Sequence, residues 1–489
     1  MSTMATGSPV PYQGNDRLLI GLIMGVLTFW LFAQTTLNVA PDMQRDLGLD
    51  ASMMNIAVAI TALFSGMFIV VTGGLADRIG RIRIMQVGLV LSMAGSLLIG
   101  LTPSGELATP FLLSGRALQG LSAACIMPAS LALVKTYWDG AARQRAISLW
   151  AIGSWGGSGL CSLFGGLVAQ NFGWRYIFFA SIVVAMVSLL LIKGTPESKA
   201  DPQGRHQFDL AGMLTFMAAM VALQILVTQG NKLGWTSPII LGLAGLALVL
   251  GTLFFRIESR AAQGFIDFKL FRNPTYAGAT ISNFLLNSVA GTLLVSLQLV
   301  QRGGNLSAQQ AGALTLGYAV AIIAFIRVGE KLLQRFGSRK PMIWGCLITG
   351  LAILLLSPAN LLLEDYKAMA MIGYTLFGIG LAFYATPSTD AALSALPAAQ
   401  AGSGAGIYKM ASSLGAAFGI AISAAIFTAL SANPDSISWM AGVITFAGRQ
   451  DNLAVREAAI IALMFNVFMV LAAILSIMLT VPKGIPKKA

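Results

Sequence analysis

The sequence is short of charged residues. Asp, Glu, Lys and Arg make up 10% of its 489 residues, whereas soluble domains carry roughly 25%. Hydrophobic residues account for 56%, which leaves too few charges to cover a soluble surface of this size. The composition therefore excludes most soluble enzymes and nucleic-acid-binding proteins, and it predicts an integral membrane protein.

Histidine and cysteine are also scarce. The single histidine, His206, falls in a polar segment, so a multi-histidine metal or haem site is excluded. The three cysteines lie in apolar segments and do not indicate a disulfide framework: Cys125, Cys161 and Cys346. No polar segment is long enough for a soluble catalytic domain, and no G-x-x-x-x-G-K-[ST] phosphate loop is present. We therefore expect neither an enzyme nor an ATP-driven pump, and no metal or other cofactor.

Long apolar runs dominate what is present. A helix needs about 20 mostly apolar residues to cross a bilayer. Fourteen apolar runs, none with more than one charged residue, approach or exceed this length, at 18–40, 52–72, 84–102, 108–134, 146–169, 176–192, 210–228, 238–255, 277–300, 308–326, 341–358, 368–389, 402–430 and 458–481. We therefore predict an all-α polytopic membrane protein with fourteen transmembrane helices. No small-residue cleavage site follows the first run, so we expect a retained helix there and not a signal peptide.

The positive charge is distributed unevenly between the predicted loops. A net charge of +12 could indicate a nucleic-acid partner. However, a cytoplasmic N-terminus gives the cytoplasmic segments roughly three times as many Lys and Arg as the outer loops, as the positive-inside rule requires. We therefore expect membrane lipid and no nucleic acid as the partner, with both termini in the cytoplasm.

A compact motif follows the second run, where residues 73–83 read GGLADRIGRIR. Its glycines permit a tight turn between two helices. Asp77 can face an arginine or the positive end of a helix. A weaker copy over residues 330–339 has Gly337 in the place of Gly80, but a glutamine in the place of the aspartate. The two copies indicate an internal repeat, a common feature of transporters.

The fifth run is rich in small residues. Gly153, Gly157, Cys161 and Gly165 recur every four residues and so share one helical face. Small residues in this arrangement let two membrane helices approach closely. They could equally be the packing residues of any helical bundle.

Two charged residues fall inside the runs, and a third directly follows the twelfth run. Arg116 lies in the fourth run, and an intramembrane arginine is by default functional, although it could instead lock helices through hydrogen bonds. Among the 19 acids, only Asp390 is placed inside the helical region, directly after the twelfth run and near its cytoplasmic end. Lys409 follows in the thirteenth. We hypothesise that Asp390 and Lys409 pair at the cytoplasmic side; the alternative is that both lie at the interface, with Lys409 extending into water.

Over nearly its whole length the chain resembles the fourteen-helix drug:proton antiporter branch of the major facilitator superfamily, and within it the Nor-type quinolone efflux pumps. The segment 73–83 matches the family signature G-x-L-a-D-r-x-G-r-x-r, and Arg116 stands in the motif R-x-x-q-G. The fifth run resembles the antiporter motif G-x-x-x-G-P-x-x-G-G, with Cys161-Ser162 in place of Gly-Pro. Further similar stretches are residues 29–34, 153–159, 281–287, 327–333, 384–390 and 406–415.

The resemblance implies a fold, a location and an activity. The chain would consist of a six-helix half (1–194), a linker with two inserted helices (195–275) and a second six-helix half (276–489). It would be a monomer in the bacterial plasma membrane that uses the proton gradient to export amphiphilic drugs. An exporter or flippase of an endogenous lipid or metabolite is the alternative.

The resemblance also implies a cytoplasmic gate. In the family, the motif aspartate meets the N-terminal end of a helix in the other half, which here is the thirteenth run near Ser403 and Gly404. The residues that would form the gating motif are Gly73, Asp77, Arg78, Gly80 and Arg81.

The sequence indicates the site of proton transfer less directly. Many members of this branch carry an aspartate in the first helix, where this chain has Phe32. A carboxylate in a dry cleft would serve, because desolvation favours its protonated form. The proton-coupling candidates are Asp390, Arg116, Lys409 and Asp42, the last at the outer mouth.

Polar and aromatic residues within the runs could line a central cavity, although each alone could be a packing residue. The candidates are Trp30, Gln34, Asn38, Asn283, Asn287, Tyr318, Tyr384 and Tyr408. Two cations and few acids in the membrane favour zwitterionic or anionic drugs over quaternary ammonium compounds, because a buried charge needs a partner.

Overall fold

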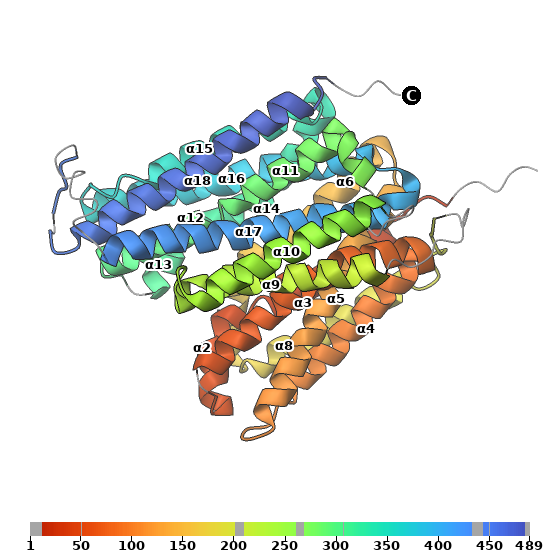
Figure 1. The fold of residues 1–489 in the computed structure, drawn as a ribbon, viewed down its shortest axis with the longest axis horizontal. Coiled ribbons are helices and arrows are strands. Elements are labelled where there is room, and N and C mark those ends of the chain that lie inside the picture. The colour runs from red at the N-terminus through yellow and green to blue at the C-terminus, as the bar shows by residue number, and fades with distance from the viewer. Residues whose placement is uncertain are drawn as a thin grey trace, which may run out of the picture.

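The computed structural model describes residues 12–49, 51–200, 210–260, 268–306, 308–432, 444–448 and 450–484. Within these ranges every regular element is a helix, which confirms the predicted class (Figure 1). Twelve helices of this part of the chain are long and apolar enough to cross a membrane, by length and composition. The other two predicted runs are also helical: 146–169 lies within the helical segment 140–171, and the apolar stretch Ala211–Val227 is short. His206 lies outside the described residues.

The first six runs form one bundle. Helices α3 and α4 both pack on α5, and α1 and α4 pack on α8. Most of these helices are apolar around their whole circumference, as expected of membrane spans. The elements are α1 Asp16–Leu27, η1 Thr28–Ala33, α2 Thr36–Leu47, α3 Ala51–Ile79, α4 Arg81–Gly100, α5 Ala108–Tyr137, α6 Gly140–Ala151, η2 Ile152–Gly156, α7 Gly157–Asn171 and α8 Arg175–Ile192.

The last six runs form a second bundle with similar packing. Helices α14 and α15 pack on α16, and α11 packs on α17 and α18. The elements are η3 Phe268–Arg272, α11 Pro274–Ser288, α12 Gly291–Gln298, η4 Leu299–Gly303, α13 Ala308–Leu314, α14 Leu316–Phe336, α15 Arg339–Leu356, α16 Leu363–Ala395, η5 Ala398–Gln400, α17 Ala401–Ala432 and α18 Leu453–Thr480. Helix α18 begins at Leu453, five residues before the start of the predicted run 458–481.

Two helices lie between the bundles in the sequence, α9 Leu210–Leu233 and α10 Pro238–Arg260. They pack on each other, and α9 also packs on α3 of the first bundle and α17 of the second. Figure 1 shows the pair crossing the front of the molecule, where the two bundles meet. The exposed side chains of α10 are largely apolar, which suits a surface that faces lipid.

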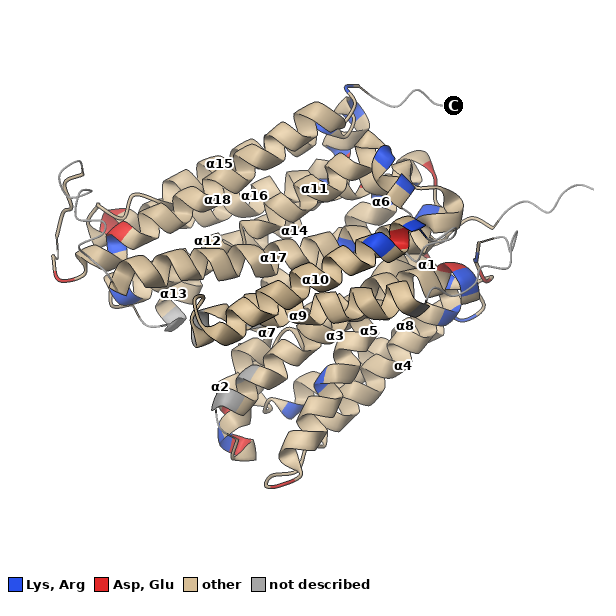
Figure 2. Cartoon of the chain, in the orientation of Figure 1, with Lys and Arg blue, Asp and Glu red and all other residues tan. Residues whose placement is uncertain are grey.

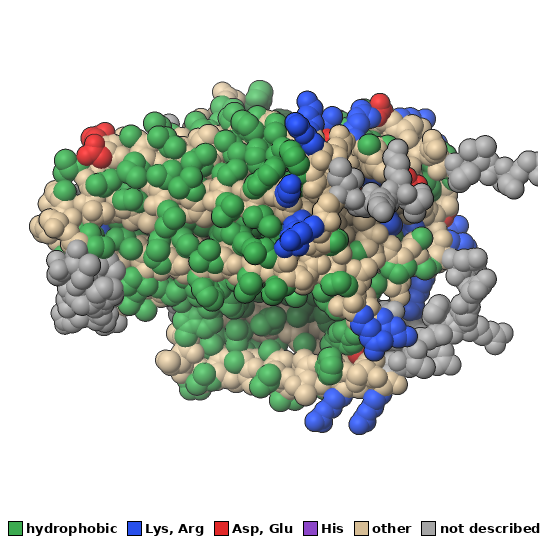
Figure 3. Space-filling view, turned by 90° about the horizontal axis from the view of Figure 1, so that it is seen from above, with side chains coloured by type: hydrophobic (Ala, Val, Ile, Leu, Met, Phe, Trp, Pro, Cys, Tyr) green, Lys and Arg blue, Asp and Glu red, His purple; other side chains and the backbone are tan. Residues whose placement is uncertain are grey.

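Charged residues gather at one end of the molecule. Figure 2 shows most Lys and Arg at the end where α6 and the end of α18 lie, and Figure 3 shows hydrophobic side chains over most of the face it presents. Helix α1 begins at the same end, where Asp16 pairs with Arg145 of α6 at 2.9 Å. We call this the basic end. Among the described residues, the loop charges counted in the sequence as cytoplasmic thus gather at one end of the fold.

Candidate functional site

Asp77 joins the two bundles at the basic end. It lies near the end of α3, and its two carboxylate oxygens accept hydrogen bonds from the backbone N–H groups of Gly402 and Ser403, at 2.8 and 2.9 Å. Both donors are in the first turn of α17, where unpaired N–H groups and the helix dipole favour an anion. The sequence predicted this meeting near Ser403 and Gly404; the structure has Gly402 in place of Gly404.

Arg81 completes this contact. Its Nε and Nη2 donate to Asp77 Oδ1 at 3.0 and 2.8 Å, and Nη2 also donates to the backbone oxygen of Ala398 at 2.6 Å. Both side chains are buried. One guanidinium and one carboxylate of the first bundle thus bind the segment that leads into α17, and together with Gly402 and Ser403 they form what we call the gate.

Gly402 of the gate and Gly73 of α3, which lies against it, have no room for a side chain. A Cβ at Gly73 would lie 2.5 Å from the oxygen of Gly402, and a Cβ at Gly402 would lie 2.4 Å from the oxygen of Gly73. Gly80 has a φ of +136°, which L-residues rarely adopt, and it turns the chain from α3 into α4. Arg78 is exposed. The spacing of the motif is therefore explained by backbone contact at Gly73 and by the turn at Gly80.

Asp390 has a different partner from the predicted one. Its Oδ1 accepts from Arg143 Nε of α6 at 3.1 Å, and its Oδ2 accepts from Gln144 Nε2 at 3.4 Å. The expected Asp390–Lys409 pair was wrong, because Asp390 faces α6 while Lys409 faces the aromatic side chains of the first bundle. Sequence reasoning sought a partner among the charges inside the runs and so passed over Arg143, which lies in a basic loop segment. The Arg143–Asp390 pair is a second bridge between the bundles.

Lys409 lies between two tryptophans of the first bundle. Its Nζ is 5.8 Å from the ring centre of Trp30 in η1 and 5.2 Å from that of Trp150 in α6. The residue is 5% exposed, so it does not extend into cytoplasmic water as the alternative interpretation required. Desolvating an ammonium costs several kcal/mol, whereas a cation–π contact returns about 2 kcal/mol when it is desolvated. The two rings therefore offset only part of the cost of placing this charge here.

Arg116 is held by neutral acceptors. It donates to the backbone oxygens of Ala57 and Ala33 at 2.9 and 2.8 Å, to Thr36 Oγ1 at 2.9 Å and to Gln119 Oε1 at 2.7 Å. These bonds tie α5 to the first span and to α3. They are the contacts expected of a structural arginine, and a role in proton coupling stays a prediction.

The small residues of the fifth run face the first span. A Cβ at Gly153, Gly157 or Gly165 would lie 3.0, 3.2 or 2.2 Å from the nearest atom of that span. The backbone oxygen of Cys161 accepts from Thr35 Oγ1 at 3.0 Å. Each of these spans also contains a π-helical turn, η1 and η2, a feature frequent at functional sites, and the two turns touch.

The polar cavity candidates of the second bundle bond to one another. Asn287 Nδ2 donates to Asn283 Oδ1 at 2.9 Å, as their predicted common face allows, and Asn283 donates to the backbone oxygen of Tyr408 at 3.0 Å. The hydroxyl of Tyr384 bonds to Ser282 at 2.7 Å. These groups stabilise contacts between helices in this conformation, and substrate contact stays a prediction for them.

The remaining candidates are spread along the first and tenth spans. Gln34 is half-buried, Asn38 is exposed beside the Cys161 sulfur, and Tyr318 packs on Phe377. Asp42 lies in the second half of α2 and pairs with Arg45. Phe32, at the position where related pumps carry an acid, is buried against Phe164. The first span thus offers no carboxylate within the bundle.

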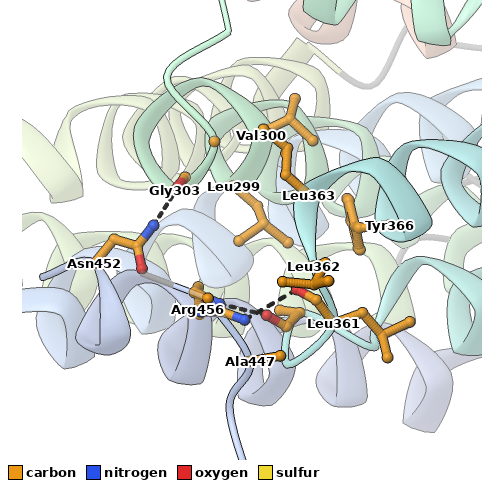
Figure 4. Close-up of a pocket in the computed structure, with 13 residues that line it drawn as sticks. Leu299, Val300, Gly303, Leu361, Leu362, Leu363, Tyr366, Ala447, Asn452 and Arg456 are labelled. Atoms are coloured by element: carbon orange, nitrogen blue, oxygen red, sulfur yellow. Dashed lines mark hydrogen bonds between the residues drawn. The ribbon is translucent and has the colours of Figure 1, made fainter. Parts of the chain in front are cut away.

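The structure also has a pocket at the opposite end from the gate (Figure 4). Leucines of η4 and of the segment before α16 form much of its wall, and Arg456 and Asn452 supply its polar groups. Arg456 donates to the backbone oxygen of Leu361 at 3.1 Å, and Asn452 donates to that of Gly303. Both residues precede the last apolar run in the sequence, so hydropathy gave no indication of this pocket.

Comparisons with known proteins agree with this architecture. Residues 20–419 match the family described as Major Facilitator Superfamily. The chain is 47% identical over 472 residues to "Quinolone resistance protein NorB" of Staphylococcus aureus strain MRSA252, which covers 96% of this chain and 97% of that protein. The same protein of strain COL is equally similar.

Solved structures show the same fold at low sequence identity. The proton:xylose symporter XylE superposes with a TM-score of 0.63 at 15% identity and covers 96% of each chain. The human organic anion transporter MFSD10 superposes with a TM-score of 0.59 at 13% identity, over 93% of this chain and 98% of that chain.

Proposed function

The chain belongs to the Major Facilitator Superfamily, and from this premise we propose that it is a proton-coupled multidrug efflux transporter that exports amphiphilic drugs, fluoroquinolones among them. The observation that carries the proposal is the 47% identity to quinolone resistance proteins over 96% of the chain. The arrangement of the site supports the proposal, because its inter-bundle contacts are of the kind that alternating access must break and remake.

The basic end is closed in this conformation. The gate and the Arg143–Asp390 pair both join the first bundle to the second there. If the basic end is cytoplasmic, as the positive-inside rule requires, this conformation faces outward. The proposed topology follows: both termini are cytoplasmic, and the helical segments 140–171 and Leu210–Leu233 also cross the membrane to give fourteen spans.

Protonation of Asp390 provides a coupling step with the sign that export requires. A charged Asp390 attracts Arg143 and stabilises the closed cytoplasmic side. A proton that enters from outside neutralises Asp390 and weakens this ion pair, which favours opening toward the cytoplasm. There the proton leaves and drug enters, and the recharged carboxylate helps to close the gate again. In this proposal the proton gradient drives the cycle without another cofactor. The transporter is a monomer whose six-helix halves, 1–194 and 276–489, are separated in the sequence by the two inserted helices.

Uptake of norfloxacin into everted membrane vesicles tests the proposal. We expect wild type to accumulate drug in a manner that an uncoupler abolishes, Asp390→Asn to lose most of this uptake, and Asp139→Asn to retain it. Asp139 is a matched control because it also lies within 3.9 Å of Arg143 but is 96% exposed. Drug uptake that the uncoupler does not reduce would contradict proton coupling. Uncoupler-sensitive uptake by Asp390→Asn would show that another residue carries the proton, and Asp42 would be tested next.

A further inference from the structure

The ammonium of Lys409 lies where the two halves meet. Lys409 is on α17 of the second bundle, and both aromatic rings beside it belong to the first. It is seven residues beyond Gly402, which places it about 10 Å from the gate along the helix. Transporters of this kind bind their substrates at the interface between the repeats. Lys409 therefore lies where a substrate would bind. It is also buried, so its charge is costly without a partner.

The partners of Lys409 are incomplete. Among the described residues its Nζ has no hydrogen bond and no ion pair, and it lies over the rings of Trp30 and Trp150. The two buried acids at this end of the interface are already used, because Asp77 binds Arg81 and Asp390 binds Arg143. A buried ammonium of this kind lacks an anion.

A second donor next to Lys409 is also unused. The indole Nε1 of Trp30 is buried and has no hydrogen-bond partner in the structure. Trp150 differs, because its Nε1 donates to Ser130 Oγ at 2.9 Å, which fixes its ring. An ammonium and an indole N–H that both lack acceptors are the groups that a carboxylate oxygen satisfies, with the Trp30 and Trp150 rings as apolar walls.

We propose that Lys409 and Trp30 form a carboxylate-binding subsite, and that the acidic group of an exported drug docks on it. This inference rests on the proposed function and names the substrate class: amphiphiles that carry a carboxylate next to a flat aromatic body. The ammonium would exchange weak contacts with two rings for a charge-assisted hydrogen bond, and the Trp30 N–H would gain its missing acceptor. The ligand would then contact both bundles at once.

Direct binding of norfloxacin and of its ethyl ester to the purified full-length protein tests the subsite. The two compounds differ only in whether the carboxylate is free. Isothermal titration calorimetry should show wild type binding the acid more tightly than the ester. Lys409→Met should weaken binding of the acid by roughly thirtyfold, the usual effect of truncating one member of a buried charge pair, and should leave the ester nearly unchanged. Lys331→Met, at an exposed lysine of α14, should change neither affinity.

Two conservative variants keep the test decisive if Lys409→Met does not fold. Lys409→Arg should retain the preference for the acid, and Trp30→Phe, which keeps a ring but removes the N–H, should reduce it by a few-fold. Equal wild-type affinities for acid and ester would overturn the subsite, as would a Lys409→Met variant that weakens both compounds alike. Failure of the proposed function is distinguishable, since it would appear as an intact acid preference in a protein whose vesicles accumulate no drug.

Discussion

At the residue scale, some buried charges bond within one bundle and others join the two bundles. Arg116 has four neutral acceptors within one bundle. Asp77, Arg81, Arg143 and Asp390 instead make contacts that cross from one bundle to the other. Because alternating access must separate the bundles at this end, the second group is the one expected to change partners during transport.

The Asp77→Asn variant should favour the open cytoplasmic side. The amide keeps the size of the carboxylate but loses its charge, so it binds both Arg81 and the α17 N-terminus less well. We expect the ratio of closed to open molecules to fall by roughly tenfold, given about 1–2 kcal/mol for an anion at a partly buried helix terminus. Spin labels at Arg83 and Lys331, measured by double electron–electron resonance, should report longer distances. Glu364→Gln, at a site 82% exposed, should leave the distances unchanged.

The Arg116→Lys variant tests the alternatives left open for that arginine. Lysine cannot reach all four acceptors, and unsatisfied buried groups cost about 1–3 kcal/mol each. If the role is structural, the melting temperature should fall by several degrees, and the surviving folded protein should still exchange drug for protons. An unchanged melting temperature with uncoupled transport would instead assign Arg116 to proton coupling.

At the element scale, the contact between α3 and α17 is set by backbone. Gly73 and Gly402 touch without side chains, so the two helices approach more closely there than any other residue would permit. The same holds between the first span and the fifth run, where glycines of η2 and α7 face Ile23, Leu27 and Thr35. Small residues thus determine which helices can slide or separate.

The Gly402→Ala variant should prevent closure of the cytoplasmic side. Its methyl group would lie 2.4 Å from the Gly73 oxygen, and such overpacking costs about 1–3 kcal/mol. We expect roughly a tenfold or greater loss of norfloxacin transport with normal expression. Gly166→Ala is the control, because nothing lies within 4 Å of its added Cβ. Full transport by Gly402→Ala would show that this close approach is not required.

At the scale of the whole molecule, the sequence predicted what depends on local composition. Apolar runs of about 20 residues lie in helices, and the motif aspartate lies at the start of α17. It did not predict the Arg143–Asp390 pair, whose members are 247 residues apart, because neither periodicity nor hydropathy reports on such a contact. The Trp150 ring beside Lys409 was missed for the same reason, since a tryptophan in an apolar run looks like any packing residue.

Proton movement driven by drug in proteoliposomes tests the central claim most directly. Purified protein is reconstituted with a pH-sensitive dye inside, and norfloxacin is added on one side without any imposed pH gradient. An antiporter moves protons in the direction opposite to the drug. The account therefore predicts that the compartment that gains drug loses protons, so that its pH rises. The Asp390→Asn variant should abolish this signal. Norfloxacin accumulation with no opposing proton movement in the wild type would contradict the account.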